Sequence, residues 1–167
     1  LGRRFDPEHG GFGSAPQFPP PSVYAFLLRY ARRARDASPL EMVETSLSAM
    51  SDGGIYDHVG GGFARYSTDD RWLVPHFEKM LYDNAQLLEL LVETHQATGE
   101  ARFAEVAREV ADYVLREMTH SGGAFFSATD ADSEGVEGKV FVWSKSEIEE
   151  LLPAPIADAV SYTHLRA

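Results

Sequence analysis

Apolar residues recur at spacings of three and four along most of the chain, which predicts a protein built from helices. The pattern predicts four helices, over residues 22–35, 38–52, 75–99 and 100–118. A shorter fifth helix is predicted just after Ser144. Because short turns join most of these segments, we expect antiparallel helical hairpins.

Two of the predicted helix starts carry a capping box, in which a hydroxyl side chain and a glutamate three residues later satisfy each other's backbone amides. One box pairs Ser38 with Glu41 and places Pro39 at the first helical position. The other pairs Ser144 with Glu147. We therefore expect helices to start at these two serines.

Glycine pairs recur between the predicted hairpins, as a loose internal repeat. Each pair is followed by apolar and then polar residues, and the pairs begin at Gly10, Gly53 and Gly122. After the second pair, residues 55–59 and 63–67 are predicted to form short strands that reverse at three consecutive glycines, Gly60 to Gly62. We expect all three loops to lie at one end of the helices, around a common ligand-binding mouth.

Composition limits the classes of function. The 167 residues are 44% hydrophobic and 25% charged, as in a single folded domain. The formal net charge of −11 argues against nucleic-acid and anionic-membrane partners, which need a basic face. The basic run "RYARRAR", residues 29–35, is interpreted as a solvated helix face. No apolar run reaches the roughly 18 residues of a membrane span.

The absence of cysteine excludes disulfides, thiolate metal ligands and a cysteine nucleophile within these residues, and it fits a reducing, cytoplasmic location. The chain starts without methionine, and residues 161–167 do not continue the preceding helical pattern. We therefore interpret residues 1–160 as part of one domain, truncated at both ends, and residues 161–167 as a non-native tail.

The densest group of ionisable residues is "YDHVGGGFARYSTDDRWLVPHFEKMLYDNAQ", residues 56–86. His76 is predicted at a helix start with Asp83 two turns later on the same face, and His58 on the preceding strand-like loop. Two histidines across a cavity would suit an epimerase, which moves a proton between the faces of a sugar. A pair of carboxylates chosen from Glu78, Asp83 and Asp57 would instead suit a glycosidase.

We predict that His58, His76 and Asp83 converge in one pocket, with Tyr56 and Trp72 on its wall. The three glycines would allow the loop to fold back over a helix start fixed by Pro75. Arg65 and Tyr66 are further candidate ligand-binding residues on the returning strand.

Each of these residues also has a purely structural interpretation. A histidine in a first helical turn often only bonds a neighbouring loop, and Glu78 could form an ordinary helix-surface pair with Lys79. Arg65 could bridge a nearby aspartate such as Asp57 or Asp69. Trp72 and Tyr66 could pack at the edge of the core rather than against a sugar.

The acidic run "DADSEGVEG" resembles the opening of a calcium-binding loop, with Asp130 and Asp132 at alternate positions. The similarity fails because Phe141 occupies the position of the final glutamate, and the flanking residues alternate as strands do. We therefore predict a β-hairpin tip that can bind ligand hydroxyls, and we expect neither a metal nor a cofactor.

The segments "GGFGSAPQFPPP", "GGIYDHVGGGFARYSTDDRWLVPHFEKMLYDNAQL" and "GGAFFSATDADSEGVEGKVFVW" resemble, in this order, a family of thioredoxin-domain-containing proteins that includes spermatogenesis-associated relatives of animals. The resemblance covers the chain to about Leu152. It departs from the family at Gln17, where a lysine is expected, and this weakens an anion-binding role for that loop.

The resemblance implies an all-α fold, part of an (α/α)6 toroid like those of sugar epimerases and six-hairpin glycosidases, with short β-ribbons at one end. It also implies a thioredoxin-like domain fused upstream. Two functions follow from it: a cavity that binds or modifies a carbohydrate-like small molecule, or a non-catalytic binding or scaffold module for the redox domain. The fold alone does not choose between them.

Overall fold

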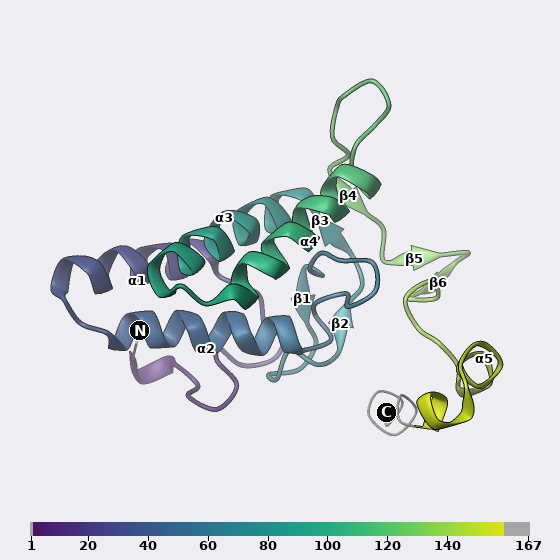
Figure 1. Cartoon of the computed structure of the whole chain (residues 1–167), viewed down its shortest axis with the longest axis horizontal. Coiled ribbons are helices and arrows are strands. Elements are labelled where there is room, and N and C mark those ends of the chain that lie inside the picture. The colour runs from purple at the N-terminus through teal and green to yellow at the C-terminus, as the bar shows by residue number, and fades with distance from the viewer. Residues whose placement is uncertain (1, 159–167) are drawn as a thin grey trace.

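The computed structural model describes residues 2–158 and consists mainly of two stacked helical hairpins (Figure 1). Helices α1 and α2 form the first hairpin, α3 and α4 form the second, and α1 also packs against α3. The helices are a short 3-10 turn η1 (Gly2–Arg4), α1 (Pro21–Ala34), α2 (Ser38–Asp52), α3 (Leu81–Thr98), α4 (Ala101–Glu117) and α5 (Lys145–Leu151). The four predicted long helices are therefore present.

One end of the helical array carries nearly all of the extended chain (Figure 1). Helices α1 and α3 begin there and α2 and α4 end there, so residues 53–80 and those after α4 gather at this end, which we call the loop end. The segment after Gly10 reaches it through a bridge between Gln17 and Ser67. The loops after Gly53 and Gly122 therefore lie at one end, as the sequence predicted. The Gly10 pair instead lies beside α2, where the amide of Gly11 donates to the hydroxyl of Ser46, and only the residues after it reach the loop end.

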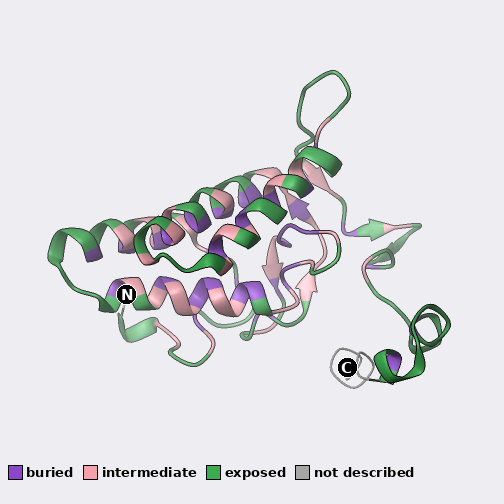
Figure 2. Ribbon diagram, viewed as in Figure 1, coloured by how far each residue is buried: buried purple, intermediate pink, exposed green. Residues whose placement is uncertain are grey.

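The core lies between the two hairpins. Buried residues line the helix faces that meet one another, whereas the segment after β4 is mostly exposed (Figure 2). The periodic spacing of apolar residues produces these faces, and the largest fully buried side chains of the helices include Tyr24, Leu47, Leu87, Leu91 and Phe103. Their burial removes the apolar surface from water and fixes the two hairpins against each other.

Short antiparallel ribbons cover the loop end. Strand β1 (Tyr66–Ser67) pairs with β2 (Pro75–His76), β3 (Lys79–Met80) with β4 (Ala128–Thr129), and β5 (Asp132–Ser133) with β6 (Val136–Glu137). The β5–β6 ribbon is the hairpin tip that the sequence predicted in the acidic run. The predicted strands 55–59 and 63–67 meet at a single bridge, between Tyr56 and Phe63.

The prediction that the third helix begins at Pro75 was wrong. Residues 75–76 and 79–80 are strands, and α3 begins at Leu81 after an extended Met80. Proline fits a strand edge as well as a first helical turn, because it lacks an amide hydrogen in both cases. Residues 75–76 pair with β1 and residues 79–80 pair with β4, and this pairing makes both segments strands rather than a helix.

The two predicted capping boxes had different outcomes. At α5 the box is present, since the Ser144 hydroxyl accepts from the amide of Glu147 and the Glu147 carboxylate accepts from the amide of Ser144. At α2 the prediction was wrong, because Ser38 already lies inside the helix. A carboxylate oxygen of Asp36 accepts hydrogen bonds from the backbone amide and the hydroxyl of Ser38 instead.

Residues 161–167, interpreted from the sequence as a non-native tail, lie outside the described residues. Over residues 2–158, no helix combines the length and apolar character that crossing a membrane requires. Within the same range, no group of three or more histidine, aspartate or glutamate side chains is arranged to hold a metal ion.

Candidate functional site

The carboxyl group of Asp83 lies in the first turn of α3, where it is only 9% exposed. Its Oδ2 atom has no hydrogen-bond partner among the described residues. Burial raises the pKa of Asp83 to about 6, with the positive charge of Arg65 opposing this shift and the negative charge of Glu78 adding to it. A carboxyl group with such a pKa can accept and release protons near neutral pH.

Arg65 and Glu78 form an ion pair beside Asp83, with 2.9 Å between a guanidinium nitrogen and a carboxylate oxygen. The backbone also joins these residues, because the amide of Arg65 donates to the carbonyl of Glu78. The predicted alternatives, an Arg65 bridge to Asp57 or Asp69 and a helix-surface pair of Glu78, were wrong, since Glu78 lies in the extended segment before α3. Three predicted site residues, Arg65, Glu78 and Asp83, are thus brought together.

Three planar rings form a row across the ribbon at the loop end. Tyr66 faces His76 across β1 and β2, with ring centroids 4.8 Å apart and planes at 17°. On the other side of Tyr66, the ring of Phe18 lies at 4.6 Å, next to the Gln17–Ser67 bridge. Phe18 is 50% exposed, so the row is accessible to a ligand. The Nδ1 atom of His76 lies 2.7 Å from a carboxylate oxygen of Glu137.

His76 is therefore held by a cross-strand stack and a carboxylate, and it does not share a helix face with Asp83. His58 lies elsewhere in the loop, with its Nε2 atom 3.1 Å from the carbonyl oxygen of Gly53 and its ring edge-on to Tyr56 at 5.3 Å. Among the described residues, no hydrogen bond or ion pair joins His58, His76 and Asp83 to one another.

Trp72 and Tyr56 do not have the exposed faces of a sugar-stacking wall, so their predicted role was wrong. Trp72 is fully buried in the hydrophobic core, and its indole nitrogen donates to the carbonyl of His9. Tyr56 is 4% exposed, and its hydroxyl donates to the carboxylate of Glu109. Burial and this carboxylate raise the pKa of Tyr56 above its ordinary value. Both aromatic residues stabilise the fold beneath the loop.

Asp57 caps the glycine turn rather than facing a ligand. One of its carboxylate oxygens accepts from the amides of Val59 and Gly60, and the other accepts from the ammonium group of Lys79. Burial alone would raise the pKa of Asp57, but the hydrogen bonds from Gly60 and Lys79 outweigh it and hold the pKa below its ordinary value. Asp57 therefore stays ionised.

Lys79 is a central residue that the sequence interpretation missed. Lys79 is only 3% exposed. Its ammonium nitrogen lies 2.8 Å from both a carboxylate oxygen of Asp57 and the carbonyl oxygen of Gly61. It also lies over the rings of Tyr113 and Phe141, at 4.5 and 5.0 Å from their centroids. Burial lowers its pKa in spite of Asp57. Side chains alternate between the two faces of a strand, and this alternation after Pro75 is the one sequence signal that would have predicted an inward-facing Lys79.

Asn84 is the second residue that the sequence interpretation missed. Its side chain is fully buried and accepts from the amide of Phe63 at 2.7 Å while donating to the carbonyl of the same residue at 3.0 Å. It also donates to the carbonyl of Met80. Asn84 thus satisfies the amide and the carbonyl of Phe63, as a neighbouring strand would. These bonds fix the returning loop to the start of α3, next to Asp83.

The glycine run lets this loop approach α4. Gly62 has a φ of +81°, and a Cβ atom at that position would lie 2.5 Å from the ring of Tyr113. A residue with a side chain would therefore meet both backbone strain and a clash. At the far edge of the loop end, Asp130 and Asp132 are exposed on the acidic hairpin, where the Asp130 carboxylate accepts from the amide of Asp132.

No protein-family model matches the sequence. The chain is, however, similar to spermatogenesis-associated protein 20. It is 44% identical to the mouse and human proteins over 95% of its own length, and 40% identical to a protein of Caenorhabditis elegans over 89%. The chain spans about a fifth of the length of these relatives: 21% of the mouse protein and 22% of the other two.

Solved structures that share this fold include sugar epimerases. Cellobiose 2-epimerase from Bacillus thermoamylovorans superposes with a TM-score of 0.66 at 15% identity, covering 77% of this chain and 36% of the epimerase. A sugar epimerase from a ruminal bacterium gives 0.60 at 14% identity, over 80% of this chain and 39% of the epimerase. The chain therefore has the fold of part of an epimerase-like helical toroid, as the sequence predicted.

Proposed function

We propose that the loop end binds a carbohydrate-like ligand and that Asp83 exchanges a proton with it. The observation that carries the proposal is the Asp83 carboxyl group, which is buried, has no partner at Oδ2 among residues 2–158, and has a pKa raised to about 6. The neighbouring carboxylate of Glu78 stays paired with Arg65. Two adjacent carboxyl groups in such different environments are the arrangement that divides acid and base roles in enzymes acting on sugars.

The row formed by Phe18, Tyr66 and His76 supports a sugar as the ligand. The apolar face of a pyranose packs well on exposed aromatic rings, while its hydroxyls need polar partners at the edges. Glu137, bonded to His76, supplies one such group, and the exposed Asp130 and Asp132 lie farther along the same segment. Tyr66 and His76 belong to the paired strands β1 and β2, which favours a preorganised ring row.

Epimerisation is the reaction that best fits a carboxyl group with the raised pKa of Asp83, beside a second carboxylate that stays paired, together with the epimerase-like fold. A base removes the proton next to the carbonyl of the open-chain sugar, the electron pair of the broken C–H bond forms the C=C bond of an enediolate, and the π pair of the carbonyl moves to its oxygen. Water then donates a proton to the opposite face of the carbon, the carbonyl re-forms, and the base releases the first proton to solvent. Asp83 would accept the first proton, and Arg65 would lie close enough to its charge to stabilise the ionised form. The structural neighbours named as cellobiose 2-epimerases make cellobiose the first substrate to test.

The test is to incubate the full-length protein with cellobiose in deuterium oxide and to follow position 2 of the reducing sugar by NMR. Turnover should produce the C2 epimer and deuterium at that carbon, and Asp83→Asn should abolish both. Asp112→Asn, which changes an exposed carboxylate on α4, should leave both unchanged. Equal activity of the two variants would overturn the assignment of Asp83.

A non-catalytic module for a fused redox domain is the second candidate function. It is favoured by the number of predicted site residues that serve the fold instead, namely Tyr56, Asp57 and Trp72. In this case the full-length protein would bind sugars at the loop end, or none at all, without exchange of the C2 proton. The deuterium experiment therefore distinguishes this function from an epimerase.

A further inference from the structure

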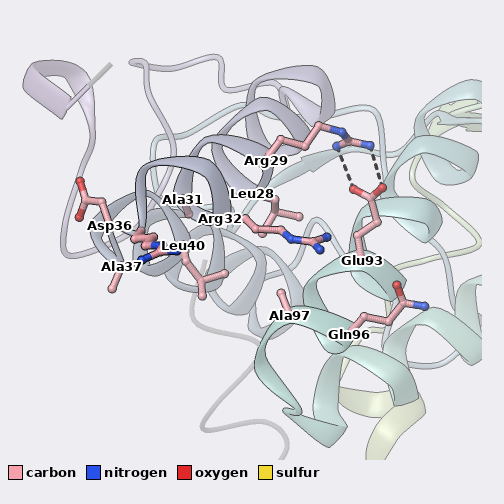
Figure 3. A pocket seen from close by; sticks show the side chains of 11 residues that line it. Leu28, Arg29, Ala31, Arg32, Asp36, Ala37, Leu40, Glu93, Gln96 and Ala97 are labelled. Carbon is pink, nitrogen blue, oxygen red and sulfur yellow. Dashed lines mark hydrogen bonds and ion pairs between the residues drawn. The ribbon is translucent and has the colours of Figure 1, made fainter.

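A hollow of about 720 Å³ lies at the end of the helical array opposite the loop end (Figure 3). It opens between the last turns of α1, the turn that leads into α2, and the C-terminal half of α3. This volume is within the range of small-molecule binding sites. The hollow shares no residue with the site around Asp83.

The floor of the hollow is apolar and its rim is basic. Leu28, Ala31, Leu40 and Ala97 line it with hydrocarbon. Three arginines, at positions 29, 32 and 35, also line the hollow. They belong to the basic run that was interpreted from the sequence as a solvated helix face. Arg29 and Arg32 are three positions apart on one side of α1, and Arg35 is the residue that ends the helix, with a φ of +55°. The chain has a formal net charge of −11, so this cluster is a positively charged patch on an acidic protein.

One of these arginines is already neutralised. The guanidinium group of Arg29 donates to both carboxylate oxygens of Glu93, at 3.0 and 2.8 Å, and this pair closes the side of the hollow between α1 and α3 (Figure 3). The carboxylate of Asp36 on the opposite side accepts from Ser38. Both acids of the lining therefore have partners within the protein.

Arg32 has no such partner in the part of the chain that the structure describes. Figure 3 shows its side chain extending from α1 across the hollow toward the side formed by α3. Within residues 2–158, no ion pair or side-chain hydrogen bond is formed by its guanidinium group. A basic residue near the end of α1 is favoured by the helix dipole. That effect applies equally to Arg33, which does not line the hollow.

We propose that this hollow binds a small amphiphilic anion, a phosphate or carboxylate group attached to a short hydrocarbon chain. Arg32 binds the anionic group, since its planar guanidinium donates two parallel hydrogen bonds to either group. The hydrocarbon packs against Leu28 and Leu40, which removes apolar surface from water. The Arg29–Glu93 pair joins α1 to the α3 wall. This site is independent of the proposed sugar site.

Octyl phosphate, kept below its micelle concentration, is the probe for this site. Titration into the full-length protein, followed by calorimetry, should give saturable binding with one equivalent. Inorganic phosphate and octanol should each bind at least tenfold more weakly, because each lacks one of the two interactions. Arg32→Gln should weaken binding about tenfold, the usual cost of losing charge-assisted hydrogen bonds. Leu40→Gln should weaken it through the apolar floor.

Arg33→Gln is the matched control, because it removes the same charge from the same helix turn outside the hollow. Unchanged affinity in this variant supports the proposal, and an equal loss in both arginine variants would overturn it as nonspecific attraction. Binding only to vesicles that contain phosphatidic acid, with none to the free probe, would also overturn it in favour of a membrane surface. Self-association of the protein that blocks the probe would overturn it in favour of a second copy.

Discussion

The ammonium nitrogen of Lys79 lies 2.8 Å from a carboxylate oxygen of Asp57, and this pair joins the segment before α3 to the glycine turn. Replacing Lys79 with methionine should lower the free energy of unfolding by about 2 kcal/mol, because the partly buried carboxylate of Asp57 loses its charged partner and keeps only the amides of Val59 and Gly60. Urea denaturation measures the change. The double variant Lys79→Met with Asp57→Asn should recover part of the loss.

The exposed pair of Lys145 and Glu149 provides the comparison, with its charged groups 3.5 Å apart on α5. Lys145→Met should change the unfolding free energy little, since solvent screens such pairs. If both lysine variants lose the same stability, burial does not strengthen the interaction of Lys79 with Asp57.

Helix positions were predictable from the sequence, whereas the contacts of the loop end were not. Helices α1, α2 and α4 each bury one face, and the apolar residues of that face recur at helical spacing within the segment itself. These helices can therefore be predicted without knowing their contacts. The start of α3 was misplaced because residues 75–80 fit both a helix and a strand, and strand pairing with residues far along the chain decided the outcome. Lys79 and Asn84 were missed for the same reason.

The candidate site was partly predictable. The cluster of ionisable residues between 56 and 86 includes Arg65, Glu78 and Asp83, which lie together in the structure. Trp72 was misassigned because a large aromatic beside polar residues has the same pattern whether it faces a cavity or the core. Only the folded structure separates these two positions.

Asn84 should be essential for the position of the loop. Asn84→Ala removes three hydrogen bonds to backbone groups of Phe63 and Met80 and leaves those groups buried, so it should cost about 3 kcal/mol of unfolding free energy. Gln86→Ala, on the exposed side of the same helix, should cost far less. Equal effects, measured by thermal and urea unfolding, would contradict the proposed role of Asn84 as a strand substitute.

Gly62 and Gly99 offer a matched pair that separates backbone strain from steric clash. Both have a positive φ, of +81° and +79°, but only Gly62 has a neighbour, Tyr113, where a Cβ atom would lie. Each alanine variant should lose about 1 kcal/mol from the strained backbone. Gly62→Ala should lose at least a further 1 kcal/mol from the clash. Indistinguishable melting curves would show that the loop relaxes away from Tyr113.

The raised pKa of Asp83 predicts a pH-dependent stability. The folded protein retains the proton up to about pH 6, whereas the unfolded chain releases it near 3.8, so burial of this group lowers the unfolding free energy as pH rises through that window. At pH 7 the cost is about 3 kcal/mol at most. Asp83→Asn should therefore be more stable than wild type at pH 7 but not at pH 4. A constant difference between these pH values would contradict the shift.

Binding and stability measured together on Asp83→Asn and His76→Ala test the central claim most directly, namely that the loop end, which carries Asp83 and the ring row of His76, forms a ligand site. The measurement is cellobiose affinity by calorimetry and melting temperature on the same samples of full-length protein, with Asp112→Asn as control. We expect both variants to lose at least tenfold in affinity while Asp83→Asn keeps or gains stability, as is common for functional polar residues. If both variants melt much lower and affinity falls only as folding is lost, these residues are structural and the claim is wrong.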